Sequence, residues 1–188
     1  GMSLRPGDWH PWTRVVNPGV PIPEAAAKVH GYTDARVQAE GTTPLPALTK
    51  AREILSDASR REIPIVLHNA AYDLTVLDRE FHRHLGWRLP GRLIVIDTLV
   101  LHWRFDWTTG GRSLSKLAAR HGIEFPAHDA EADARATLDL LRILADANDL
   151  LPIIEPRALH QAQVGWWAAR QESLEARVLG NGAAFVPQ

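Results

Sequence analysis

The sequence predicts an α/β protein with a partly parallel sheet, because short apolar strands alternate along the chain with amphipathic helices. The apolar runs at residues 63–67 and 93–97 have the length of buried strands. Apolar residues recur at helical spacing over residues 70–84 and most clearly over residues 129–147. Strands that alternate with helices are typical of a parallel sheet that helices cover.

The remaining elements follow from turn residues and weaker patterns. Alternation at residues 9–16 predicts a first strand. Pro23 is expected to open a short helix that Gly31 closes, and Thr33 is expected to cap a second one. Further helices are expected at residues 46–60, 113–122 and 157–178.

Composition limits the classes of function. The 188 residues are 45% hydrophobic and 23% charged, which is ordinary for one globular domain with a sizeable core. A net charge of -1 argues against a general nucleic-acid coat protein, although it leaves room for an enzyme whose bound metals neutralise phosphate. Cysteine is absent, which rules out disulfides and thiolate metal sites and fits a cytoplasmic protein. No apolar run is long enough to span a bilayer, so we expect no membrane partner.

Two helices each place an acid near the N-terminal end of the predicted apolar face. Asp73 falls on the stripe that Leu74 and Leu77 continue, and Asp133 lies four residues before Thr137 on the other helix. An unpaired buried carboxylate is costly, and a divalent cation shared by both acids would offset that cost. Hard oxygen ligands without cysteine suggest Mg²⁺ or Mn²⁺.

His128 precedes Asp133 by five positions, where a histidine could take a proton from a water nucleophile. Acids that hold metals, together with a base, are the parts of two-metal phosphodiester hydrolysis. Each residue also has a plainer interpretation. Asp73 could respond only to the helix dipole, Asp133 could bond a neighbouring backbone N–H, and His128 could be an ordinary surface residue. Asp97 and Asp129 are interpreted as helix caps.

Together these residues resemble the DnaQ-like 3'–5' exonucleases of the DEDDh type, the family of the bacterial polymerase III proofreading subunit. The stretch "HNAAYD" at residues 68–73 is similar to the family's second motif, and "HDAEADARAT" at residues 128–137 is similar to its third, His-x4-Asp. His30 and Gly31 stand where the family has a similar His-Gly pair. The resemblance covers about residues 13–148.

The resemblance implies a ribonuclease H-like mixed sheet flanked by helices and a 3'–5' exonuclease acting on DNA or RNA. It makes Asp73 and Asp133 ligands of Mg²⁺ or Mn²⁺ in a two-metal site, and His128 the general base. It implies single-stranded 3' ends as substrate and a DNA polymerase as a possible partner, in proofreading or repair. The same resemblance implies that His30, Gly31 and Asn69 contact the substrate.

The family's first motif, Asp-x-Glu-Thr-Thr-Gly, does not occur in this sequence. We therefore expect a sheet that lacks the family's N-terminal strands, an incomplete metal site, and impaired or absent activity. Three explanations for the missing motif remain: the chain is truncated, a segment was lost between a tag and the domain, or the protein is a degenerate relative of the family. Strand 9–16 would then either slide in beside residues 63–67 or leave a gap that a second copy of the chain closes in a homodimer.

Three segments are expected along the chain. Residues 1–8 are interpreted as a tag remnant or leader, residues 9–148 as the exonuclease-like domain, and residues 149–188 as a helical extension packing on the same domain. A non-catalytic module that binds nucleic-acid ends or a polymerase-type partner is the main alternative function. A metal phosphohydrolase using the His128-Asp129 pair is a third, which the two predicted strands make less favourable.

Overall fold

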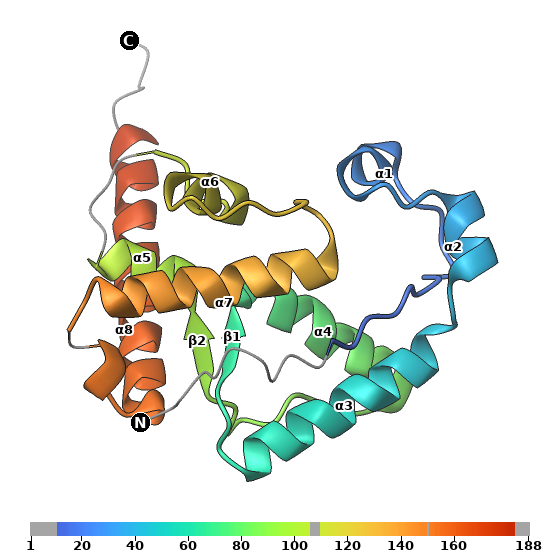
Figure 1. Cartoon of the computed structure of the whole chain (residues 1–188), viewed down its shortest axis with the longest axis horizontal. Coiled ribbons are helices and arrows are strands. Elements are labelled where there is room, and N and C mark those ends of the chain that lie inside the picture. Colours follow the sequence, from blue (N-terminus) through green and yellow to red (C-terminus); the bar gives the residue numbers. More distant parts are fainter. Residues whose placement is uncertain (1–10, 106–109, 150, 183–188) are drawn as a thin grey trace.

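The computed structural model describes residues 11–105, 110–149 and 151–182, so the leader expected at residues 1–8 lies outside the described residues. The fold is a mostly helical α/β arrangement around a small parallel sheet, which confirms the predicted fold class (Figure 1). In chain order the elements are α1 (Glu24–His30), α2 (Asp34–Glu40), α3 (Pro44–Arg60), β1 (Ile65–Leu67), α4 (Ala70–Leu85), β2 (Val95–Asp97), α5 (Thr98–Phe105), α6 (Leu114–Arg120), α7 (Ala130–Asp146), a 3-10 turn (Leu151–Ile153) and α8 (Pro156–Gly182).

The two strands are parallel, and Ile65, Val66 and Leu67 lie opposite Val95, Ile96 and Asp97. Helix α7 packs against β1, and α8 packs against β2 and α5. The main core cluster forms where β2 meets these helices, and its aliphatic side chains each stabilise the fold by about 1.5–3 kcal/mol. Its buried members are Ile96, Leu101, Leu117, Leu140, Leu141, Leu144, Leu151 and Leu159.

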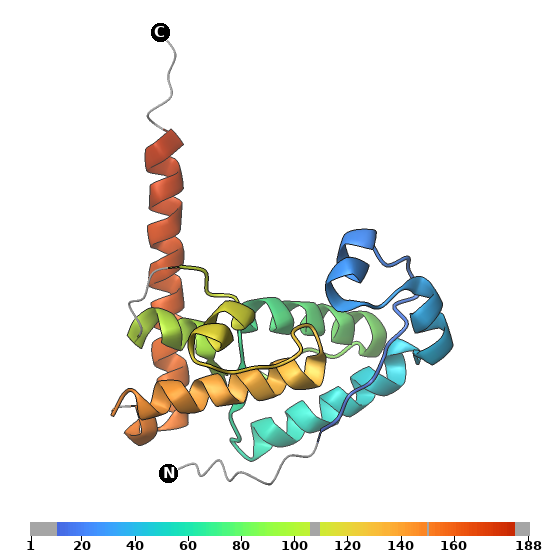
Figure 2. The ribbon, with the colours of Figure 1, turned by 45° about the horizontal axis from the view of Figure 1, so that its top comes forward.

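Figure 2 shows α8 standing as a long rod that projects beyond the packed body, whereas α1 and α2 lie at the opposite end of the molecule. None of the described helices combines the length and apolarity that crossing a bilayer requires.

The two edges of the sheet differ. On the β2 edge, Gln163 of α8 accepts a hydrogen bond from the Asp97 N–H at 2.8 Å and donates one to the Val95 carbonyl at 3.2 Å. The amide side chain thus replaces a neighbouring strand. On the other edge, no described strand pairs with β1. Because Ile65 donates its N–H to Ile94 across the ladder, Val66 points its backbone groups to the open side.

The strand predicted at residues 9–16 is wrong for the described residues 11–16. They form only an isolated parallel bridge between Val16 and Thr42, and Trp12 remains 39% exposed. The segment therefore does not slide in beside β1, as one of our expectations had it. A strand propensity is realised only when neighbouring strands and a core face support it, and the segment has neither.

The backbone of Asn17 approaches the residue before Thr42 so closely that this position, Gly41, must be a glycine. A Cβ on Gly41 would lie 2.4 Å from the Val37 carbonyl oxygen and 2.9 Å from the Asn17 nitrogen. The N-terminal segment therefore binds to the joint between α2 and α3, away from the sheet, with the Asn17 N–H donating to the Thr42 carbonyl at 2.8 Å.

Candidate active site

Asp97 ends β2 and connects the starts of two helices. Its side chain, 6% exposed, accepts hydrogen bonds from the N–H groups of Asn69 at 3.0 Å, Ala70 at 2.8 Å and Leu99 at 2.9 Å. Leu99 belongs to α5, so the expectation that Asp97 caps a helix is confirmed. Ala70 opens α4, so the same carboxylate also caps a helix that begins 27 positions earlier in the chain.

Asn69 occupies the N-cap position of α4, but its side chain makes no capping bond. Its backbone is left-handed, with φ of 69°, and the α4 donors are already taken by Asp97. Asn69 therefore does not cap α4 with its side chain, because the Asp97 carboxylate from β2 accepts these N–H groups.

Asp73 lies in the first turn of α4 and is exposed, so its predicted place on the core-facing side is wrong. The first turn extends past the end of β1, where the described chain has no strand to cover it. Surrounding atoms still remove enough water to raise the pKa of Asp73, and repulsion from Asp97 raises that pKa further. Two carboxylates thus repel each other at this end of the sheet, an arrangement that a cation would relieve.

His68 follows β1 directly and was not singled out by the sequence analysis. Its Nδ1 lies 2.9 Å from the Thr98 hydroxyl, and its Nε2 lies 2.9 Å from the Arg112 carbonyl oxygen, so the ring joins β1 to the segment before α6. Burial lowers the pKa of His68, against the opposing effects of the Arg112 carbonyl, Asp97 and Asp73. A histidine that ends a strand and precedes an Asn–helix start was the only available signal.

Asp133 and His128 meet at the start of α7. The Asp133 carboxylate accepts a hydrogen bond from the His128 N–H at 3.2 Å, which is the plainer interpretation given above for Asp133. His128 has a left-handed backbone, with φ of 72°, and an exposed side chain. Asp129 accepts from the Ala132 N–H at 2.9 Å, so its predicted role as a cap is confirmed.

The metal role expected for Asp73 and Asp133, with His128 as general base, stays a prediction. Within residues 11–105, 110–149 and 151–182, no three His, Asp or Glu side chains lie where they could hold a metal ion together. Asp73 and Asp133 supply the right donor chemistry for a hard cation, one from each helix. A complete two-metal site, however, does not fit the described residues alone.

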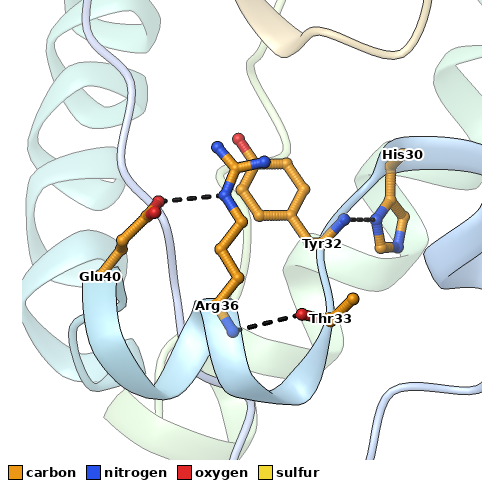
Figure 3. Close-up of polar contacts among 5 residues, drawn as sticks. All are labelled: His30, Tyr32, Thr33, Arg36 and Glu40. Atoms are coloured by element: carbon orange, nitrogen blue, oxygen red, sulfur yellow. Dashed lines mark hydrogen bonds and ion pairs between the residues drawn. The ribbon is translucent and has the colours of Figure 1, made fainter.

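His30 and Gly31 end α1 far from β1, at the opposite end of the molecule from α8 (Figure 1). Gly31 has φ of 74°, the left-handed value that favours glycine at a helix end. Figure 3 shows His30 Nδ1 accepting from the Tyr32 N–H at 3.1 Å, and Arg36 lies 4.2 Å above the Tyr32 ring. The guanidinium of Arg36 is also fixed by Glu40, at 3.1 Å.

A hollow of about 590 Å³ lies between the N-terminal segment with Tyr32 and α2 on one side and the start of α7 on the other. Trp12 and Tyr32 supply aromatic walls, and acids from α2 and α7 supply negative charge. The hollow therefore brings the segment after His30-Gly31 opposite the helix that carries Asp133. Its lining residues are Pro11, Trp12, Thr13, Arg14, Val15, Tyr32, Glu40, Asp129, Ala130, Glu131 and Ala134.

Comparison with known proteins identifies the family. Residues 11–141 match the family model described as Exonuclease. The chain belongs to this exonuclease family. The resemblance to DnaQ-like 3'–5' exonucleases, of the ribonuclease H-like superfamily, is thereby confirmed. Exonucleases of this type generally depend on divalent metal ions.

A similar protein is the "DNA polymerase III subunit epsilon-like protein" of Rhodobacter capsulatus, which is 33% identical over 149 residues. The alignment covers 77% of this chain and 19% of that protein, so the chain spans about a fifth of the length of the relative it matches.

Proposed function

We propose that the chain is the part of a metal-dependent 3'–5' exonuclease that carries the second and third motifs, for hydrolysis of terminal phosphodiester bonds in DNA or RNA. The observation that carries this proposal is the exonuclease family match over residues 11–141, which includes Asp73 and Asp133. The ends of β1 and β2 support it, because they gather Asp73, Asp97 and His68 within electrostatic range of one another.

In this proposal Asp73 and Asp133 bind Mg²⁺ or Mn²⁺, and His128 acts as general base. The metal would supply charge stabilisation for the phosphodiester. The exposed imidazole of His128 is free to reach a water molecule, while its backbone N–H holds Asp133 in place. The remaining proposed substrate contacts are His30, Gly31 and Asn69.

We further propose that the 188 residues alone have little or no activity. The sequence contains no Asp-x-Glu-Thr-Thr-Gly motif, and the described residues contain no three-ligand group. Metal placement carries much of the charge stabilisation in such reactions, so two absent acids should cost orders of magnitude in rate.

The test combines degradation with metal binding. End-labelled single-stranded DNA and RNA are incubated with the chain and Mg²⁺ or Mn²⁺, and Mn²⁺ affinity is titrated for the parent, Asp73→Asn and Asp133→Asn. We expect negligible 3' trimming and weakened Mn²⁺ binding in both variants, with Asp139→Asn on α7 as the unaffected control. Robust trimming that Asp73→Asn abolishes would refute the proposed impairment, and Mn²⁺ binding that neither variant weakens would refute the metal site.

A non-catalytic role is the second candidate, favoured by the lack of a three-ligand group in the described chain. In that role the chain binds nucleic-acid ends or a polymerase-type partner without hydrolysing anything. The printed name of the Rhodobacter relative refers to polymerase III, which motivates the choice of partner. Fluorescence anisotropy with a labelled 3' end, with and without Mn²⁺, separates the candidates, because a binding module needs no metal.

The open edge of β1 supports a further part of the proposal, a homodimer. Within the described part of the chain no strand pairs with the outward backbone groups of Val66, whereas Gln163 closes the β2 edge. Light scattering tests this, and Val66→Pro serves as the probe, because proline removes the outward N–H at an open edge. Val66→Ala controls for the packing of this side chain against the core cluster. A parent chain that is monomeric at all concentrations would contradict it.

A further inference from the structure

The buried carboxylate of Asp97 makes more contacts than a helix cap requires. An ordinary N-cap side chain bonds one or two N–H groups of its own helix. Asp97 bonds Leu99 of its own helix and also Asn69 and Ala70 at the start of α4. These two N–H groups lie 28 and 27 positions earlier in the chain, so the bonds fix α4 to the end of β2.

The start of α4 has little local support of its own. Asn69 makes no side-chain cap to α4, and its backbone is left-handed, a conformation that asparagine adopts more readily than most L-residues. By contrast, the bonds from Asp97 are short and buried, where hydrogen bonds to a charged group are strongest. The direction in which the first turn of α4 points therefore depends on Asp97.

Asp97 is in turn held from α8. Gln163, 4% exposed, accepts the Asp97 N–H at 2.8 Å and donates to the carbonyls of Val95 and Leu159, each at 3.2 Å. A continuous set of buried hydrogen bonds thus runs from α8 through the end of β2 to the first turn of α4, the turn that carries Asp73.

We infer that Asp97 is a positioning residue that sets the location of Asp73 at the end of the sheet, with Gln163 as its support. This inference rests on the proposed function in one respect, the role of Asp73 as a metal ligand. Asp97 is not assigned to the metal, since its side chain is only 6% exposed and both of its oxygens already accept backbone N–H groups.

The test uses Asp97→Asn, which keeps the shape and one acceptor oxygen but turns an NH2 group toward a backbone donor. Amide hydrogen exchange is measured on the metal-free chain. We expect exchange at Asn69 and Ala70 to accelerate by about tenfold or more, because bonds to a charged acceptor are lost. Gln163→Leu should accelerate the same amides by a smaller factor, about threefold.

Thr33→Ala is the matched control, because it removes the side-chain cap of α2, a helix that carries no proposed ligand. It should accelerate exchange near Arg36 and leave Asn69 and Ala70 unchanged. Mn²⁺ affinity provides the readout that a merely structural role would not move. Asp97→Asn should weaken it about tenfold, whereas Thr33→Ala should leave it unchanged.

Two results would overturn the inference: unchanged exchange at Asn69 and Ala70 in Asp97→Asn, or equal acceleration of all core amides, including those of α7. Failure of the proposed function is separable from these. If Asp73→Asn leaves Mn²⁺ affinity intact, Asp73 is not a metal ligand. The exchange rates at Asn69 and Ala70 still decide whether Asp97 positions α4.

Discussion

Helices α4 and α7 each carry a candidate ligand in the first turn, but they begin in different ways. Helix α7 is started locally: Asp129 caps Ala132, and Asp133 bonds the backbone of His128 five residues earlier. Helix α4 is started from a distance, by Asp97 at the end of β2. The first turn of α7 therefore holds its geometry from its own sequence, whereas that of α4 depends on the assembled sheet.

The two helices also differ in how deeply they pack. The buried side chains of α7 include Leu140, Leu141 and Leu144, which belong to the main core cluster. Helix α4 buries only Ala70 and Phe81, and it leaves Tyr72 67% exposed. Asp133 therefore lies on a helix that packs deeply into the core, whereas Asp73 lies on a helix with one side exposed.

Truncating a core side chain should destabilise the protein much more in α7 than in α4, and this is the largest expected difference between the two helices. Leu140→Ala, at a fully buried position, is expected to reduce the free energy of unfolding by about 2–5 kcal/mol. Leu74→Ala on the half-buried face of α4 is expected to cost about 1 kcal/mol, because less surface is removed from the core. Urea unfolding followed by circular dichroism measures both. Equal losses would mean that α4 is anchored as firmly as α7.

Removal of the local cap of α7 should have the next largest effect. Asp129→Ala leaves the Ala132 N–H without its acceptor, and we expect a loss of about 1 kcal/mol in the free energy of unfolding. Asp129→Asn should recover most of this loss, since an amide oxygen also caps well. A loss that Asn does not recover would indicate that the charge, and not the hydrogen bond, stabilises the helix start.

The difference between the two starts also explains what the sequence could predict. The amphipathic helices α3, α4 and α7 were predicted because their apolar spacing is strong, and Asp129 was recognised because a cap bonds within its own turn. Helix α5 was missed, because Thr98–Phe105 is apolar on nearly every side and gives no helical stripe.

Within the candidate site, only contacts between residues close in the sequence could be predicted. Asp97 was expected to be a cap, but no local pattern indicates that it would cap α4 as well. The exposure of Asp73 could not be read from its stripe, because it depends on which strands cover the first turn. The contact of His68 with Arg112 spans 44 positions and likewise follows only from the tertiary structure.

Asn69 allows a smaller test of the distant start of α4. Asn69→Ala should cost up to about 1 kcal/mol, because alanine tolerates the left-handed backbone poorly. Asn69→Gly should stay within about 0.5 kcal/mol of the parent, because glycine adopts that backbone freely while losing more entropy on folding. Thermal unfolding of both variants is the measurement. Equal losses in the Gly and Ala variants would contradict the role of the left-handed backbone.

The smallest expected effect is the pH dependence that Asp73 confers on the metal-free chain. The folded-state pKa of Asp73 is raised above its ordinary value of 3.8 by partial loss of water and by Asp97. Its protonated form therefore stabilises the fold below pH 3.8, and that contribution is lost as the pH rises through the raised pKa. Asp73→Asn cannot ionise, so its stability relative to the parent should rise across this window and then stay level at higher pH.

The gain in the free energy of unfolding of Asp73→Asn over the parent should be only about a few tenths of a kcal/mol, because the Asp73 side chain is exposed and solvent screens its charge. Added salt should shrink it by screening the repulsion from Asp97. Saturating Mn²⁺ should reverse the order of the two proteins, because a ligand that binds only the folded parent stabilises it in proportion to its affinity. A difference that is independent of both pH and Mn²⁺ would show that Asp73 acts neither as a strained acid nor as a ligand.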